Sequence, residues 1–207
     1  MSFVDPSSKN KLFNADTIYD YLLEYKKELS NALEKVSASD LNKVFDLLQD
    51  ARRYNKRIWV AGNGGSAAIA DHLCCDFTKG TRFTSKKSLK TNSLSSNSAI
   101  LTAIANDFGY DQIFLQQLEM LSNKDDIVIL ISSSGNSENV IRAAEWANDN
   151  GLTTISLTGF SGGKLSKITK INLHIPLNNY GIVEDAHQIL MHSLAQFISK
   201  VNQFSLS

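Results

Sequence analysis

The stretch IVILISSSGNSENV, residues 127–140, decides the fold of this chain. Its five opening apolar residues are typical of a strand buried on both faces of a sheet. The serine-rich segment 132–137 follows, and a helical pattern begins at Glu138 with Ser137 as the expected N-cap. The hydroxyls, Gly135 and the free N–H groups of the first helical turn together favour an anion, most often a phosphate. Because no lysine cluster accompanies them, we expect a small phosphorylated metabolite rather than nucleic acid.

A second strand, loop and helix repeat this arrangement. Residues 56–61 (KRIWVA) predict a strand, the loop GNGGS occupies 62–66, and the apolar residues of 67–77 predict a helix. The loop lacks the glycine spacing of a dinucleotide fingerprint and the closing Gly-Lys-Ser/Thr of a triphosphate loop. One such loop is explained by an ordinary tight turn. Two of them at strand ends indicate a ligand site, because open α/β sheets bind ligands there.

Strands and helices alternate from Lys56 onward. The predicted strands are 56–61, 88–93, 126–131, 152–158 and 170–175, and the predicted helices are 66–77, 98–106, 111–121, 137–149 and 181–203. This alternation predicts an α/β fold with a doubly wound, five-stranded parallel sheet. Apolar spacing at 16–36 and 40–54 predicts an N-terminal helical pair. We expect residues 1–55 and 56–207 to form one domain, with the pair packed either across the domain edge or between subunits.

Composition excludes several classes of function. The 207 residues carry 21 basic and 21 acidic side chains, so no net field attracts nucleic acid or a membrane surface. Residues 1–11 are polar and do not resemble a signal peptide, and no apolar run approaches a membrane span. The adjacent Cys74 and Cys75 cannot bridge usefully and are interpreted as core thiols of a reduced protein. We therefore expect a cytoplasmic enzyme without a membrane or nucleic-acid partner.

Four motifs carry a resemblance to a known family. They are GNGGSA (62–67), NDFGYDQIF (106–114), ISSSGNSENV (131–140) and SLTGFSGGKL (156–165). With them the chain resembles the sugar isomerase (SIS) domain, and within that family the sedoheptulose-7-phosphate (phosphoheptose) isomerases. The resemblance implies a flavodoxin-like fold and a homotetramer with sites at subunit interfaces. It also implies enediol conversion of sedoheptulose 7-phosphate to D-glycero-D-manno-heptose 7-phosphate, a step toward the heptoses of bacterial lipopolysaccharide or capsule.

The resemblance also implies which residues bind the substrate, in agreement with the anion loop inferred above. The sugar would contact Asn63, Gly64, Gly65, Ser66, Asn106 and Asp107, and the phosphate would contact Ser132, Ser133, Ser134 and Ser137. As an alternative, Asp107 is a plain turn residue within its motif.

Aldose–ketose isomerisation needs a base beside the carbonyl and an acid–base partner for the enediol oxygens. His72 and Asp76 lie four residues apart and therefore share a helical face. The resemblance implies Zn²⁺ held by a histidine and a glutamate here and by a glutamine and a histidine on the last helix. This chain has Asp76 for that glutamate, Glu184 for the glutamine and His192 for the second histidine. It also has Gly181 where the family usually has an aspartate.

These departures leave the base open between Asp76 and Glu184, with His192 as its acid–base partner. The set His72, Asp76, Glu184 and His192 suits zinc and is more anionic than that of the family. A rival hypothesis is a non-catalytic tetrameric SIS module that binds a replication initiator protein. Ionisable residues at all four positions favour the enzyme, and an isomerase or epimerase of a different phosphosugar is a second alternative.

Overall fold

Five parallel strands form the centre of the structure, a computed structural model that describes residues 13–82 and 87–204. They are β1 (Arg57–Gly62), β2 (Lys90–Ser93), β3 (Ile127–Ser132), β4 (Thr153–Thr158) and β5 (Ile171–His174). Their order across the sheet is β2-β1-β3-β4-β5, with every neighbouring pair parallel. The predicted doubly wound parallel sheet is confirmed, and each strand closely overlaps its predicted range.

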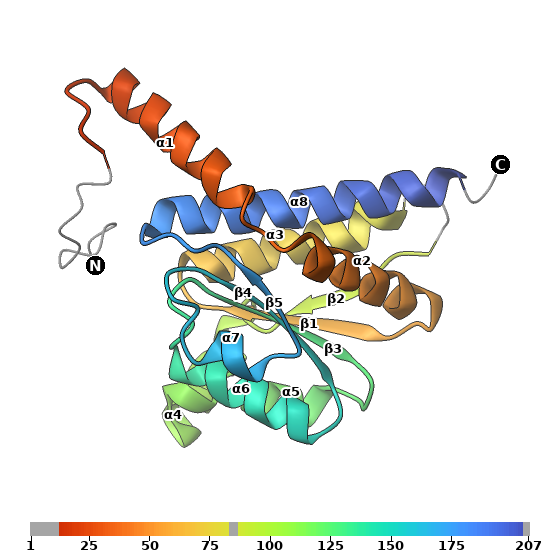
Figure 1. Ribbon diagram of the computed structural model, residues 1–207. Coiled ribbons are helices and arrows are strands. Elements are labelled where there is room, and N and C mark those ends of the chain that lie inside the picture. The colour runs from red at the N-terminus through yellow and green to blue at the C-terminus, as the bar shows by residue number, and fades with distance from the viewer. Residues whose placement is uncertain (1–12, 83–86, 205–207) are drawn as a thin grey trace.

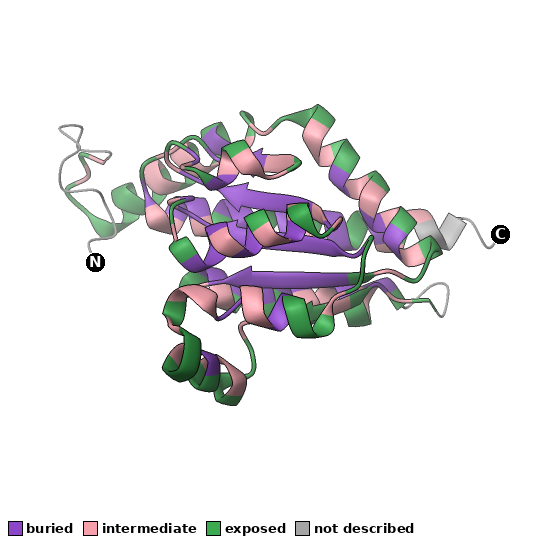
Figure 2. Cartoon of the chain, turned by 90° about the horizontal axis from the view of Figure 1, so that it is seen from below, coloured by how far each residue is buried: buried purple, intermediate pink, exposed green. Residues whose placement is uncertain are grey.

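Helices cover both faces of the sheet (Figure 1). One face carries α2 (Ala38–Arg53), α3 (Gly65–Lys79) and α8 (Tyr180–Phe204), and the other carries α4 (Ser98–Phe108), α5 (Leu115–Leu121), α6 (Glu138–Asp149) and α7 (Leu165–Ile168). Successive strand residues alternate between the two apolar cores: Ile58 belongs to the first and Trp59 to the second. Figure 2 shows the buried colour concentrated on the central strands of the sheet. Burial on both faces explains why the central strand β3 is a continuous apolar run in the sequence, whereas the edge strand β2 (KTNS) is polar and exposed or half-buried.

The strand order places the two predicted loops next to each other. From β1 the chain goes to β2 on one side, and from β3 it goes through β4 to β5 on the other side. The strands β1 and β3 therefore flank the switch point of the sheet. Gly62 at the end of β1 is in register with Ile131 near the end of β3. The loops 62–66 and 132–137 therefore leave the same edge of the sheet side by side.

Some short elements differ from the prediction. The predicted helix 111–121 is instead a 3₁₀ turn (Tyr110–Gln112) followed by α5, which begins only at Leu115. Gly109 precedes the turn with φ +99°, a conformation that ends α4 and redirects the chain. The 3₁₀ turn Gly80–Arg82 and the single turn α7 were not predicted, because such short elements carry no helical periodicity.

The two N-terminal helices are packed unequally. α2 buries Val44 and Leu48 in the core that β1 and α3 share. By contrast, α1 (Ile18–Leu33) extends away from the body of the molecule (Figure 1). Its first turns expose apolar side chains: Ile18 is 85% exposed and Leu22 is 58% exposed. From Tyr25 onward α1 packs against the rest of the chain: Tyr25 bonds to Asp185 of α8, and Leu29 and Ala32 join the first core. The pair therefore packs across the domain edge in part, and packing of the exposed start of α1 between subunits stays a prediction.

The two cysteines do not share one environment. Cys74 is half-buried, and burial raises the pKa of its thiol to about 12. Cys75 is exposed, so the prediction of two core thiols is wrong for this residue. Neighbouring helical residues point about 100° apart, and only one of an adjacent pair can face the sheet directly.

Membrane-spanning helices are absent from the part of the chain that the structure describes, since none there combines the necessary length and apolar character. Residues 1–11, whose polar composition led to the prediction that no signal peptide is present, lie outside the described residues.

Candidate active site

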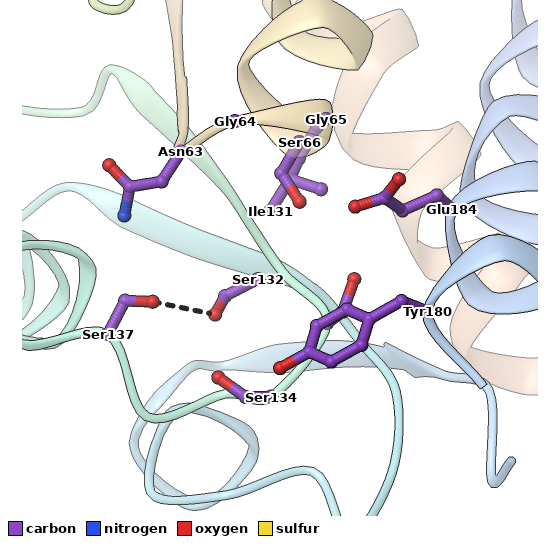
Figure 3. A pocket seen from close by; sticks show the side chains of 11 residues that line it. Asn63, Gly64, Gly65, Ser66, Ile131, Ser132, Ser134, Ser137, Tyr180 and Glu184 are labelled. Carbon is purple, nitrogen blue, oxygen red and sulfur yellow. Dashed lines mark hydrogen bonds between the residues drawn. The ribbon is translucent and has the colours of Figure 1, made fainter. Parts of the chain in front are cut away.

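A cavity of about 310 Å³ opens where β1 and β3 end (Figure 3). The first loop contributes Asn63, Gly64, Gly65 and Ser66 to its lining, and the second contributes Ser132, Ser133, Ser134 and Ser137. Ile131 from β3, and Tyr180 and Glu184 from α8, complete the described lining. None of these residues is a lysine or an arginine. The structure thus brings the two predicted loops together in a pocket of neutral polar groups with one carboxylate.

The serine loop presents hydroxyls that its own fold leaves available. Ser133 is 4% exposed, and its Oγ is buried without a hydrogen-bond partner among the described residues. A buried hydroxyl of this kind is costly unless a ligand satisfies it. Ser137 occupies the N-cap position of α6 as predicted, but its side chain makes no capping hydrogen bond. Its Oγ lies 3.4 Å from that of Ser132 instead, so the Ser137 side chain does not occupy the N-terminus of α6, where an anion could bind.

Glycine is required at two positions around this cavity. Gly135 has φ +66°, and a side chain there would collide with the carbonyl of Gly162 in the neighbouring loop. Gly65 opens α3 directly beneath the carboxylate of Glu184, and a Cβ at this position would lie 2.6 Å from Glu184 Oε1. The absence of a side chain at Gly65 therefore makes room for the Glu184 carboxylate in the pocket.

The side chain of Asn63 is held by a network that the sequence did not predict. Its amide exchanges two hydrogen bonds with the amide of Asn139, of 2.9 and 3.0 Å. The hydroxyl of Tyr110 donates a third, of 2.9 Å, to Asn63 Oδ1. Both partners lie within the quoted motifs, in ISSSGNSENV and NDFGYDQIF, but neither residue type signals such a contact by itself. Tyr180 of the lining was likewise missed, since a lone tyrosine at a helix start carries no motif.

Two predicted substrate residues lie outside the described lining. Asn106 and Asp107 are exposed at the last turn of α4, where the Asn106 amide donates a 2.8 Å hydrogen bond to Asp107 Oδ1. Their contact with a substrate remains a prediction.

A separate group of possible metal ligands lies between α3 and α8. Donor atoms of His72, Asp76 and His192 fall within 4.8 Å of one another. The Nε2 atoms of the two imidazoles are 3.5 Å apart, and they lie 3.7 and 3.5 Å from oxygens of Asp76. The Gln188 amide nitrogen lies 2.8 Å from His72 Nδ1 and 3.3 Å from His192 Nε2, a neighbour that the sequence did not predict.

Glu184 belongs to the pocket rather than to this three-residue group. It is half-buried, and desolvation raises the pKa of its carboxyl, with a further increase from the charge of Asp185. Asp185 in turn accepts a 2.6 Å hydrogen bond from the Tyr25 hydroxyl of α1. The Tyr25 ring occupies the space beside Gly181, where the family's usual aspartate would stand.

Fold and site together define a class of protein: a doubly wound α/β domain with a pocket of neutral polar groups and one carboxylate at the switch point of its sheet. The family is identified by its domain model. The chain belongs to the SIS domain family, whose model matches residues 21–159. The resemblance inferred from the four motifs is confirmed.

Its relatives share most of its length. The phosphoheptose isomerase of Helicobacter pylori (strain P12) is 37% identical over 185 residues, which cover 89% of this chain and 95% of that protein. The phosphoheptose isomerase of Aliarcobacter butzleri is 37% identical, covering 85% and 92%. Among solved structures, phosphoheptose isomerase GmhA from Neisseria gonorrhoeae is 29% identical with a TM-score of 0.80, covering 89% of this chain and all of that one.

Proposed function

We propose that this protein is a sugar-phosphate isomerase that converts sedoheptulose 7-phosphate to D-glycero-D-manno-heptose 7-phosphate. The observation that carries the proposal is the pocket itself, in which the neutral serine loop and the carboxylate of Glu184 face one cavity. The curated relatives named phosphoheptose isomerase support this substrate over other phosphosugars. They also make the alternative of a non-catalytic binding module the less favoured one.

In this proposal the serine loop binds the phosphate and the glycine loop binds the sugar. The hydroxyls of Ser133 and Ser137 and the N-terminus of α6 donate hydrogen bonds to phosphate oxygens. Asn63, fixed by Asn139 and Tyr110, presents its loop to the sugar hydroxyls. These contacts fix the carbonyl end of the substrate relative to α8, and such positioning is itself a large part of catalysis.

Glu184 is the base of the proposed reaction. Its carboxylate takes a proton from C1 of the ketose and returns it to C2, while a proton moves between the two oxygens of the enediol. No atom is gained or lost, as an isomerisation requires. The raised pKa of Glu184 suits this role, because a base whose pKa is closer to the working pH accepts a proton more readily. Asp76, the other predicted base, is assigned instead to the metal-ligand group that it forms with His72 and His192.

The residues His72, Asp76 and His192 fit a zinc ion. Ligand atoms about 2.0–2.1 Å from a tetrahedral zinc lie about 3.3 Å apart. Here the two Nε2 atoms are 3.5 Å apart, and they lie 3.7 and 3.5 Å from different oxygens of Asp76. A bound ion would act as a Lewis acid that polarises the sugar carbonyl. The predicted roles of Glu184 as a fourth ligand and of His192 as an acid–base partner remain predictions.

We further propose a cytoplasmic homotetramer in which residues 1–55 and 56–207 form one domain and the sites lie at subunit interfaces. The exposed apolar side chains of α1 support the association, because Ile18, Tyr19 and Leu22 are each more than half exposed in the described chain. Light scattering of wild-type protein and of a variant with Ile18→Ser and Leu22→Ser tests it: the variant should have the lower mass.

The test of the proposed function is turnover. Wild-type protein is incubated with sedoheptulose 7-phosphate, with and without a chelator, and the aldose is followed by NMR. Glu184→Gln should reduce the rate by about 10²-fold or more, because it keeps the shape and removes the base. Glu119→Gln, the same change at an exposed position of α5, is the matched control and should keep the wild-type rate. Full activity of Glu184→Gln would contradict the assignment of the base, and absence of wild-type turnover would contradict the substrate.

A further inference from the structure

Gln188 stands on α8 between the pocket and the two histidines, one helical turn after Glu184 and one turn before His192. It is half-buried, and its amide nitrogen lies 2.8 Å from Nδ1 of His72, the ordinary length of a hydrogen bond. The same atom is 3.3 Å from Nε2 of His192. The shorter contact therefore joins α8 to the imidazole that α3 provides.

The two ring nitrogens of His72 face different partners. Nε2 points toward the metal-ligand group, 3.7 Å from Asp76 and 3.5 Å from His192 Nε2. Nδ1 points toward Gln188. The neighbours of the ring thus separate a face that can bind a metal from a face that can hydrogen-bond.

A metal-binding imidazole uses its two nitrogens in just this way. One nitrogen coordinates the metal, and the other donates its N–H to an acceptor that fixes the tautomer and the ring orientation. Glutamine supplies both a donor and an acceptor, and a half-turn of its amide exchanges the oxygen and nitrogen positions without moving the rest of the side chain. After this rotation the amide oxygen lies beside His72 Nδ1 and can accept a hydrogen bond from Nδ1–H.

We propose that Gln188 is a positioning residue that accepts a hydrogen bond from Nδ1–H of His72 and thereby holds Nε2 toward the zinc site. The inference rests on the metal-assisted function proposed above and deepens it. Gln188 lies in none of the four motifs and does not line the pocket, so only its contacts across the helix pair reveal this role. Loss of an outer partner of this kind typically weakens metal binding 10- to 100-fold.

The experiment measures zinc affinity rather than turnover. Chelator-stripped full-length protein is titrated with Zn²⁺ in competition with a chromophoric chelator. Gln188→Leu should bind zinc 10- to 100-fold more weakly than wild type, because leucine has no acceptor for Nδ1–H. Gln188→Glu should bind at least as tightly as wild type, because its carboxylate accepts the same hydrogen bond. Gln196→Leu, the same change at an exposed position two turns further along α8, should bind like wild type.

A second measurement separates positioning from loss of folding. Imidazole ¹⁵N NMR of the zinc-loaded wild type should show the proton of His72 on Nδ1, and melting temperatures of the variants should stay close to that of wild type. Gln188→Leu with zinc affinity within twofold of wild type would overturn the inference, and so would a wild-type protein that takes up no zinc. A wild type that binds zinc but leaves sedoheptulose 7-phosphate unchanged would refute the proposed substrate alone.

Discussion

Replacing Gly65 by alanine tests how closely the pocket positions Glu184. A Cβ built at this position would lie 2.6 Å from Glu184 Oε1 and 2.7 Å from its Cδ. Glu184 Oε2 would be nearer still, and ordinary contacts of a Cβ begin at 3.4 Å, so the carboxylate must retreat by about 1 Å. The carboxylate ends a flexible side chain and can move, whereas the helix start that carries residue 65 is held in the fold.

The displacement should lower turnover while leaving the fold stable. A misplacement of about 1 Å in a reacting group can reduce the rate by about 10²-fold. Alanine favours a helix over glycine by about 1 kcal/mol at most near this end, so stability should stay within about 1 kcal/mol of wild type. We therefore expect Gly65→Ala to lose activity mainly in kcat, with a melting temperature close to that of wild type.

The assay compares kcat and KM for sedoheptulose 7-phosphate with urea denaturation of the same preparations. Gly80→Ala is the matched control, since residue 80 caps the other end of α3 and a Cβ there meets nothing within 4 Å. A Gly65→Ala variant with the kcat of wild type would refute the reasoning, because Glu184 would then tolerate a shift that a base in contact with substrate cannot.

Two further predictions concern charge. Asp185→Asn should move the acidic limb of the pH–rate profile to lower pH. The rate falls when the base is protonated, and the pKa of Glu184 is raised first by burial and then by the Asp185 carboxylate. The substitution removes the second of these causes. An unchanged limb measured from pH 4 to 8 would contradict Glu184 as the titrating base. Asp126→Asn should lower the free energy of unfolding by about 2 kcal/mol in urea titrations. The buried Asp126 carboxylate accepts 3.0 Å hydrogen bonds from Trp59 Nε1 and from the backbone N–H of Arg57. An amide has only one acceptor oxygen and cannot accept both bonds in the same way. Stability equal to wild type would show that the amide finds other partners there.

The sequence predicted the fold well because the relevant signals are local. Apolar runs, helical spacing and the two polar loops at strand ends each lie within a short window, and their alternation leaves few ways to build a sheet. The failures follow the same logic. α5 was predicted too long because the 3₁₀ turn Tyr110–Gln112 before it is too short to show a spacing of its own. Cys75 was placed in the core although its helical face points outward.

The site was predicted in its loops but not in its supporting contacts. The pocket contains Ser132, Ser133 and Gly65 from stretches in which hydroxyls and glycines stand next to one another in the chain. The contacts of Asn63 with Asn139, and of His72 with Gln188, join residues far apart in sequence. Amide side chains of this kind are common on helix surfaces, so no local pattern distinguishes these from the others.

The sequence by itself determined the α/β class, the parallel sheet and the two polar loops at the strand ends, because each depends on residues close together in the chain. Only the tertiary structure separated the two acidic candidates, setting Glu184 over Gly65 in the pocket and Asp76 beside two imidazoles. Residue types and helical spacing could not do so, because the outcome depends on how α3 and α8 approach across the sheet. The distances between facing helices depend on the packing of the whole core, which no single segment of the sequence determines.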